Sequence, residues 1–143
     1  MVKCALKLCI GRAHAHRGQA KAFLQLFHNS KVASSAQLVE VEQWSPVDVP
    51  ADVQSVVEDI INAAVKDPRT LMLDHSDPNG SAPATGSAKY LVIEERNYFA
   101  VTACLKTLES LADYIRVVLN LPLLATDAMS RVIEFLKVPL SPS

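Results

Sequence analysis

The residues best suited to metal chemistry are histidines and cysteines near the start of the chain. His14 and His16 lie two residues apart, with Cys4 and Cys9 before them and His28 after them. Zinc sites combine such ligands in recognisable clusters, and these spacings match none of them. Two histidines two residues apart also point to different sides of a helix. We therefore expect no metal site here, and no metal or cofactor in the protein.

Two short polar pairs, Glu94–Glu95 and Asp74–His75, are the candidates for acid–base chemistry. General acid–base catalysis needs groups that converge in a closed cleft, whereas these pairs fall in an expected turn and an expected loop. The sequence also contains no G-x-S-x-G motif, no P-loop and no glycine-rich dinucleotide fingerprint. We predict that the protein has no catalytic residues and is not an enzyme, and that it functions by assembly.

Composition narrows the class of protein further. The 143 residues suit about one domain, and half of them are hydrophobic while a fifth are charged. A net charge of -1 gives no general attraction to nucleic acid. No apolar run reaches the roughly 18 residues of a transmembrane helix. The three cysteines, an odd number, indicate reduced cytosolic thiols, and Cys104 is expected to be buried among apolar neighbours.

The N-terminal third of the chain is basic. Six basic residues precede the first acid, Glu40, namely Lys3, Lys7, Arg12, Arg17, Lys21 and Lys31. Such a segment is typical of a mitochondrial targeting peptide, of one basic helix face, or of a weak contact with acidic lipid. Gly11 and Gly18 count against targeting because they interrupt the amphipathic helix that a targeting peptide needs.

Proline positions divide the chain into expected helices and links. The first helix is predicted over residues 19–43, with Phe23, Leu26 and Phe27 on one stripe. An extended link over residues 44–50 leads to a second helix that ends near Lys66. Residues 67–89 have the composition of a flexible linker.

The C-terminal third carries the strongest pattern. Residues 90–94 and 98–100 are predicted to form a β-hairpin around a turn at residues 95–97. The next helix is predicted over residues 101–119, with a heptad-like seam at Val101, Leu105, Leu108, Ala112, Ile115 and Leu119. Asn120 ends that helix, and Thr126 is the expected N-cap of the last one. The last helix is expected to bury Met129, Val132, Ile133 and Leu136.

Two features suggest contact with other proteins. Trp44, the only tryptophan, is expected to cap the groove between the first two helices, with an interface anchor as the alternative. The apolar surface of the last helix, with Phe135 beside it, is broader than one neighbouring helix covers. The candidate protein-interaction residues are therefore Trp44, Met129, Val132, Ile133 and Leu136.

The predicted fold is mainly α, a helical bundle or rod fragment with a short β-hairpin. Residues 1–66 hold the N-terminal helices and the Trp-Pro link, and residues 67–89 the flexible linker. Residues 90–138 hold the hairpin and two helices, and residues 139–143 a tail. Together these regions are expected to form one incomplete domain.

An ordered series of motifs over residues 22–137 resembles the middle region of one family, vacuolar protein sorting-associated protein 54. It begins with EQW, ending at Trp44, and the link PVDVPADVQ, in which Asp52 and Val53 replace the family's usual Glu and Phe. It resumes after a variable linker with YLVIE, ADY, NLP, ATD and the last helix RVIEFLK. After Lys137 the chain departs from the family, which continues into a Leu-Gly-Ala-Gly stretch, and residues 1–19 have no clear match. We therefore expect a truncated or alternatively spliced product.

The resemblance implies a subunit of the Golgi-associated retrograde protein complex, which tethers endosome-derived vesicles at the trans-Golgi network. It implies rod-like helical structure of the coiled-coil type, and other subunits of the tethering complex and SNAREs as partners. The implied location is the cytosolic face of the Golgi apparatus, with peripheral membrane association through partners. The family's N-terminal assembly coiled coil and C-terminal endosome-directed domain have no counterpart in this sequence.

Two alternatives to this interpretation remain open. The first is a small independent helical protein-binding module in the cytoplasm, which should be monodisperse in solution. The second, more remote, is an enzyme with a site of unfamiliar pattern.

Overall fold

The computed structural model describes residues 17–67 and 86–137. The predictions for His14 and His16, for Cys4 and Cys9, for most of the flexible linker and for the tail lie outside the described residues. The division of the chain into four regions stays a prediction.

Helices dominate the described part of the chain, so the prediction of a mainly α fold with a short β-hairpin is confirmed. The order of elements is α2 (Arg17–Val41), β1 (Val49–Pro50), α3 (Ala51–Val65), β2 (Ser87–Ala88), β3 (Leu91–Ile93), β4 (Arg96–Tyr98), α4 (Thr102–Asn120), the 3₁₀ turn η2 (Pro122–Leu124) and α5 (Ala125–Lys137).

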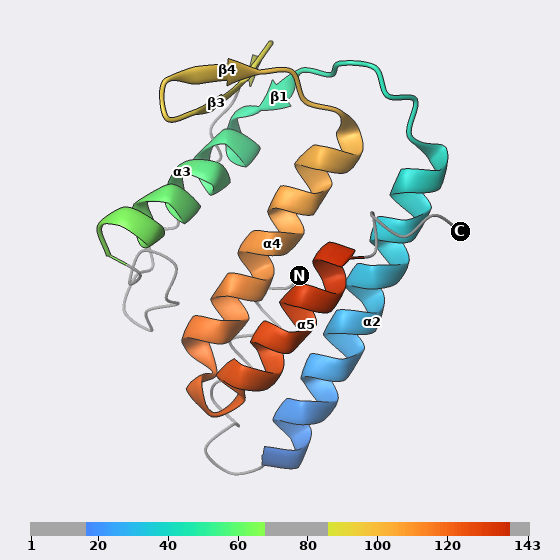
Figure 1. Cartoon of the computed structure of the whole chain (residues 1–143), viewed down its shortest axis with the longest axis vertical. Helices are drawn as coiled ribbons and strands as arrows, with labels where there is room; N and C mark the ends of the chain where they lie inside the picture. The colour runs from blue at the N-terminus through green and yellow to red at the C-terminus, as the bar shows by residue number, and fades with distance from the viewer. Residues whose placement is uncertain (1–16, 68–85, 138–143) are drawn as a thin grey trace.

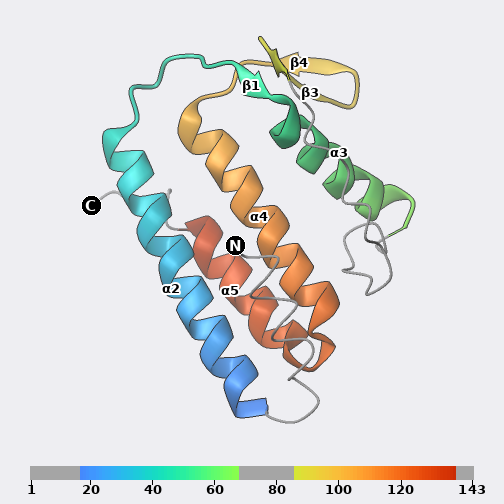
Figure 2. The same ribbon diagram turned by 180° about the vertical axis from the view of Figure 1, so that it is seen from behind.

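The central element is α4, and the other helices lie around it (Figure 1). Helices α2 and α5 pack against α4 and against each other, whereas α3 packs on α4 and on the strands. Figure 2 shows the molecule from behind, with α2 and α3 on opposite sides of α4. This arrangement gives α4 two buried faces, and it explains why one heptad-like seam did not describe the helix.

Each face of α4 contributes to a separate hydrophobic core. The three-helix core joins α2, α4, η2 and α5 and buries Ala20, Leu24, Phe27, Tyr114, Val117, Leu121, Leu124, Ala128, Val132 and Phe135. The sheet-side core joins α3, the strands and the start of α4 and buries Val49, Val53, Val57, Leu91, Ala100 and Leu105. Cys104 belongs to neither core. The prediction that it is buried was wrong, because its side chain lies on an exposed flank of α4.

The hairpin turns at Glu94 and Glu95, whose φ angles are 47° and 67°. Strand β4 follows at once and pairs Leu91 with Tyr98 and Ile93 with Arg96. Two positive φ angles in a two-residue loop match the right-handed twist of the strands, although Asn-Gly is the usual sequence there. The prediction of a turn at residues 95–97 and a second strand at residues 98–100 was therefore wrong.

Helix α3 holds the hairpin through one side chain. The Gln54 amide donates to the Val92 carbonyl at 2.9 Å and accepts from the Val92 amide at 3.0 Å. In a two-residue hairpin the backbone groups of the second pair from the turn face the outer edges. Gln54 thus satisfies both outward groups of Val92 on the edge that faces α3.

The link between α2 and α3 is also attached to distant backbone. Val49 pairs with Ala88 and Pro50 with Ser87, and Val47 forms a bridge with Ala100. Residues 87–88, which the sequence placed in the flexible linker, therefore form a strand. These pairings join segments far apart in the sequence, and no local pattern indicated them.

The C-terminal helices differ from expectation at one junction. Helix α4 ends at Asn120, as predicted. The amide of Leu124 then donates to the carbonyl of Leu121, and η2 continues directly into α5 at Ala125. Thr126 lies inside this continuous winding, so the prediction that it is an N-cap was wrong.

Candidate protein-interaction surfaces

A buried polar chain fixes the three helices around which the candidate surfaces lie. The side chain of His28, from α2, is 6% exposed and lies against the fully buried Tyr114 of α4. Its Nδ1 is 2.7 Å from the Tyr114 hydroxyl, and its Nε2 is 3.1 Å from the Glu134 carboxylate of α5. Since an ionised carboxylate only accepts, Nε2 carries the hydrogen and Nδ1 accepts from the tyrosine.

Arg131 extends the buried polar chain to the surface of the protein. Arg131 donates to Glu134 at 2.9 Å and to Gln25 of α2 at 2.7 Å. Its hydrogen bond holds the pKa of the Glu134 carboxyl below its ordinary value. Burial lowers the pKa of His28, with Arg131 acting in the same direction, and burial raises the pKa of Tyr114. Histidine is therefore held neutral and tyrosine protonated.

The hydrogen-bonded His28–Tyr114–Glu134 chain positions the three helices. The Tyr114 ring lies between Phe27 and Phe135, with ring centroids 4.9 and 5.1 Å apart. A histidine and a tyrosine enclosed by core rings fix helix rotation, because a buried polar atom without its partner costs about 1–3 kcal/mol. Sequence reasoning considered His28 only as a metal ligand. Within residues 17–67 and 86–137 there is no group of three or more side chains that could hold a metal ion.

Helix α5 presents an exposed apolar stripe. Ala128, Val132 and Phe135 point into the three-helix core, whereas Met129, Ile133 and Leu136 are 48%, 53% and 42% exposed. The predicted buried face was correct only for Val132. The apolar residues cover an arc of about 160° at 100° per residue, and Ala128 and Phe135 at one side of that arc are buried in the three-helix core while the other side faces solvent.

The exposed stripe forms one continuous surface. Met129, Ile133 and Leu136 follow the i, i+4, i+7 spacing, so they lie on one flank of α5. Arg131 and Glu134 contact α2 from roughly the opposite flank, since each residue advances about 100° around the helix. Of the residues predicted for interaction, the structure brings these three together and places Val132 inside the core.

Trp44 lies apart from that stripe and is 68% exposed. Its φ angle of 55° is left-handed, which costs a residue with a side chain about 1–2 kcal/mol. The Glu42 carboxylate compensates by accepting from the amides of Gln43 and Trp44, at 3.0 and 3.3 Å. The prediction that Trp44 caps a groove between the first two helices was wrong, because this turn directs the ring away from the core.

Glu42 also caps α4. Its second carboxylate oxygen accepts from the amide of Ala103, in the first turn of α4, where the N-cap Val101 makes no side-chain bond. An acid near a helix N-terminus is favourable because the unpaired amides there carry partial positive charge. Residues 43–46 thus form an exposed bulge between two attachments, at Glu42 and at Val47. We call this bulge the Trp44 corner.

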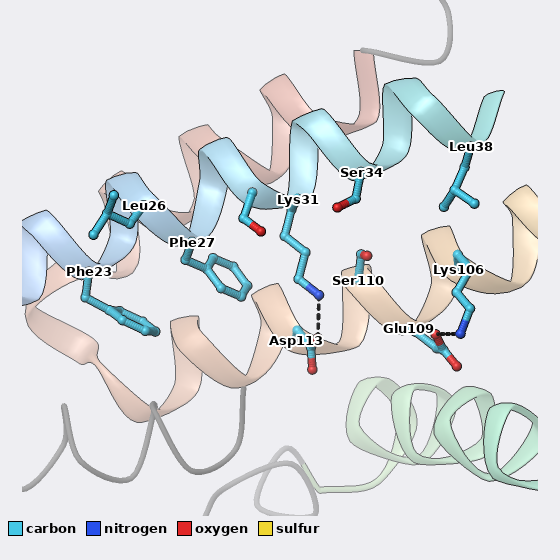
Figure 3. Close-up of a pocket in the computed structure, with 11 residues that line it drawn as sticks. Phe23, Leu26, Phe27, Lys31, Ser34, Leu38, Lys106, Glu109, Ser110 and Asp113 are labelled. Atoms are coloured by element: carbon cyan, nitrogen blue, oxygen red, sulfur yellow. Dashed lines mark hydrogen bonds and ion pairs between the residues drawn. The ribbon is translucent and has the colours of Figure 1, made fainter. Parts of the chain in front are cut away.

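A groove of about 500 Å³ runs between α2 and α4. Figure 3 shows Phe23, Phe27 and Lys31 directed from α2 toward α4, with Leu38 at one end of the groove. The Lys31 ammonium is 2.8 Å from Asp113, which also pairs with Arg116 at 3.2 Å. Sequence reasoning missed the groove. The sequence signal for the groove was that the spacing of three and four residues along α2 continues through Ser34, where we expected only a weakened apolar stripe.

Comparison with known proteins gives a similarity to one protein. Over 123 residues, 86% of this chain, it is 26% identical to vacuolar protein sorting-associated protein 54 of Homo sapiens. The Mus musculus and Rattus norvegicus proteins of the same name are 27% and 28% identical over 125 residues. The chain spans about 12% of the length of these relatives.

Other comparisons gave no match. No protein-family model matches the chain, and no solved structure matches it. In the part of the chain that the structure describes, each helix is too short or too polar to cross a lipid bilayer.

Proposed function

We propose that this chain is a fragment of a vesicle-tethering complex subunit that acts in retrograde transport from endosomes to the trans-Golgi network, by protein–protein assembly. The similarity to vacuolar protein sorting-associated protein 54 over 86% of the chain supports the proposal. The exposed stripe of α5 is the observation that carries it, because it offers a surface for assembly.

The stripe suits the apolar face of another helix. Met129, Ile133 and Leu136 advance by four and three residues, and the ridges that such rows form pack into the grooves of a neighbouring helix. Complete burial of a side chain of this kind is worth about 1.5–3 kcal/mol. These residues are already about half buried, so each gives about half of that gain.

The proposal also names binding partners and a location in the cell. The partners are the other subunits of the tethering complex, with SNAREs as further contacts. The chain is carried to the cytosolic face of the trans-Golgi network by these partners and binds the membrane only through them. It catalyses no reaction.

The test is co-purification of the chain with the remaining subunits of the tethering complex. We expect the wild-type chain to be retained and the variant Ile133→Lys to bind at least tenfold more weakly, because a charge replaces a central apolar contact. The control is Val65→Lys, the same change at an exposed apolar position at the end of α3, away from α5. Equal retention of Ile133→Lys and wild type would contradict the role of α5, and failure of wild type to bind would contradict the proposal.

A small independent helical binding module is the second candidate. Among the described residues every buried side-chain nitrogen and oxygen has a hydrogen-bond partner, as in a self-contained fold. Sedimentation velocity at tens of micromolar, a range that reveals weak self-association, separates the two functions. Self-association that Ile133→Lys reduces favours the tether fragment, whereas a monomeric wild-type chain favours the module.

A further inference from the structure

The groove between α2 and α4 lies on a different side of the molecule from the exposed stripe of α5. In Figure 1, α5 covers one face of the α2–α4 pair, and Figure 2 shows the opposite face. The groove lining comes from α2 and α4 alone. A partner in the groove is therefore independent of a partner on α5.

The groove has the length and lining of a helix-binding site. Its α2 wall advances in steps of three or four residues, and Val41 continues the row Phe23, Phe27, Lys31, Ser34 and Leu38. Between Phe23 and Val41 the row is about 27 Å long, at 1.5 Å per residue, or five helical turns. An amphipathic helix places a side chain on one face at the same repeat.

Apolar side chains at both ends of the row are open to solvent. Leu26 and Val41 are each 72% exposed, and Leu38 is half-buried. The middle of the floor is closed by the ion pair of Lys31 with Asp113, both less than one-fifth exposed. Because these charges are paired with each other, recognition is left to the apolar ends and to the corner beyond Val41.

The Trp44 corner begins two residues after Val41. Its ring is exposed, its backbone is left-handed, and the Glu42 carboxylate holds that backbone in place from the first turn of α4. Strained backbone kept by specific bonds clusters at ligand-binding sites, and tryptophan is enriched among the residues that dominate binding energy. The corner is therefore a pre-ordered anchor.

Charge at the corner selects the partner. Residues 40–48 contain Glu40, Glu42 and Asp48 and no Lys or Arg. Lys106, which lines the groove near Leu38, is paired with Glu109 at 2.8 Å, so the end stays negative. It attracts basic side chains and opposes an anionic lipid surface.

From these observations we infer that the α2–α4 groove, with the Trp44 corner at its end, binds an amphipathic helix of a partner protein that carries Lys or Arg at the Trp44 end. This binding is separate from the assembly proposed for α5.

The experiment uses a labelled synthetic amphipathic peptide of about 20 residues, long enough for five turns, with a leucine stripe and lysines at one end. A twin carries glutamates in place of those lysines. Fluorescence anisotropy gives affinity, and emission of the single tryptophan of the protein reports on the corner. We expect the lysine peptide to bind with a blue shift of that emission, and the glutamate twin to bind at least tenfold more weakly.

Two variants locate the peptide. Trp44→Ala removes the anchor and Ser34→Arg fills the middle of the groove, and both positions are exposed, so circular dichroism should show an unchanged fold. Each should weaken peptide binding by about tenfold or more. The matched control Leu123→Ala, at an equally exposed apolar position in η2, at the other end of α4, should bind like wild type.

Four outcomes overturn the inference. The first is no peptide binding up to about 1 mM. The second is that Trp44→Ala and Ser34→Arg both bind the peptide as tightly as the wild-type protein. The third is binding lost in Ile133→Lys instead, which places the helix on α5. The fourth is a tryptophan blue shift on phosphatidylserine vesicles without peptide binding, which assigns the corner to a membrane.

Discussion

The three-helix core and the sheet-side core use the two faces of α4 in different ways. The three-helix core contains aromatic rings and the hydrogen-bonded His28–Tyr114–Glu134 chain. The buried members of the sheet-side core are all aliphatic, and the strands around it are joined by short backbone ladders and by Gln54. The first core therefore fixes helix rotation through directional side-chain contacts, whereas the second relies on main-chain register.

The largest difference in stability between the two cores is expected when a central aromatic ring is truncated. Phe135 is fully buried against Tyr114, and Phe135→Ala should cost about 3–5 kcal/mol of unfolding free energy. The matched change Val57→Ala in the sheet-side core removes fewer atoms and should cost less. Urea denaturation of both variants checks the order. Equal losses would show that the two cores contribute alike.

The buried polar chain should show coupling that an aliphatic core lacks. Tyr114→Phe leaves Nδ1 of His28 without its donor and should cost about 1–3 kcal/mol. A double-mutant cycle with His28→Leu should recover part of that loss, because both polar partners are then absent. A purely additive cycle would mean that the hydrogen bond contributes nothing to the three-helix core.

On the sheet side, Gln54→Ala tests the hold of α3 on the hairpin. It removes two hydrogen bonds to Val92, each worth about 0.5–1.5 kcal/mol, and solvent replaces part of them at this exposed edge. Amide exchange of β3 should accelerate, while exchange of α5 stays unchanged. Acceleration in both places would show that the two cores open as one unit.

The smallest expected effect is on pH dependence. The folded-state pKa of His28 is lowered from 6.5 by burial, so below about pH 6.5 the unfolded chain binds the proton more readily. Stability should fall as pH drops from about 7.5 through 6.5 toward the folded pKa. Urea titrations of wild type and His28→Gln at pH 7.5 and 5.5 measure this, and wild type should lose more stability. Parallel losses would assign the effect to other groups.

The helices were predictable from sequence because their signals are local. Proline spacing and three-and-four periodicity gave every described helix within about two residues. The rotation of α5 was not predictable, because Met129, Val132 and Phe135 are all apolar and the choice among them depends on the shape of α4. Trp44 was misplaced for a related reason, since its turn depends on a bond from Glu42 to Ala103, far along the chain.

The hydrogen-bonded pairs near the candidate surfaces could not be predicted from local sequence pattern either. His28 and Tyr114 lie on different helices, and their bond exists only once α2 and α4 are packed. The exposed stripe of α5 was anticipated in part, because an apolar arc wider than one contact leaves some side chains uncovered. The hydrogen bond from His28 of α2 to Glu134 holds one flank of α5 against α2, so Met129, Ile133 and Leu136 on the other flank face outward.

The carboxylate of Glu42 has a mechanical consequence. It joins the link after α2 to the first turn of α4, and Val47 joins the same link to Ala100 a few residues further on. A pull on the Trp44 ring is therefore shared between the end of α2 and the start of α4. Because several hydrogen bonds must then break together, the corner resists peeling away from the bundle. Tension applied at the corner thus passes into α4, the central helix of the bundle.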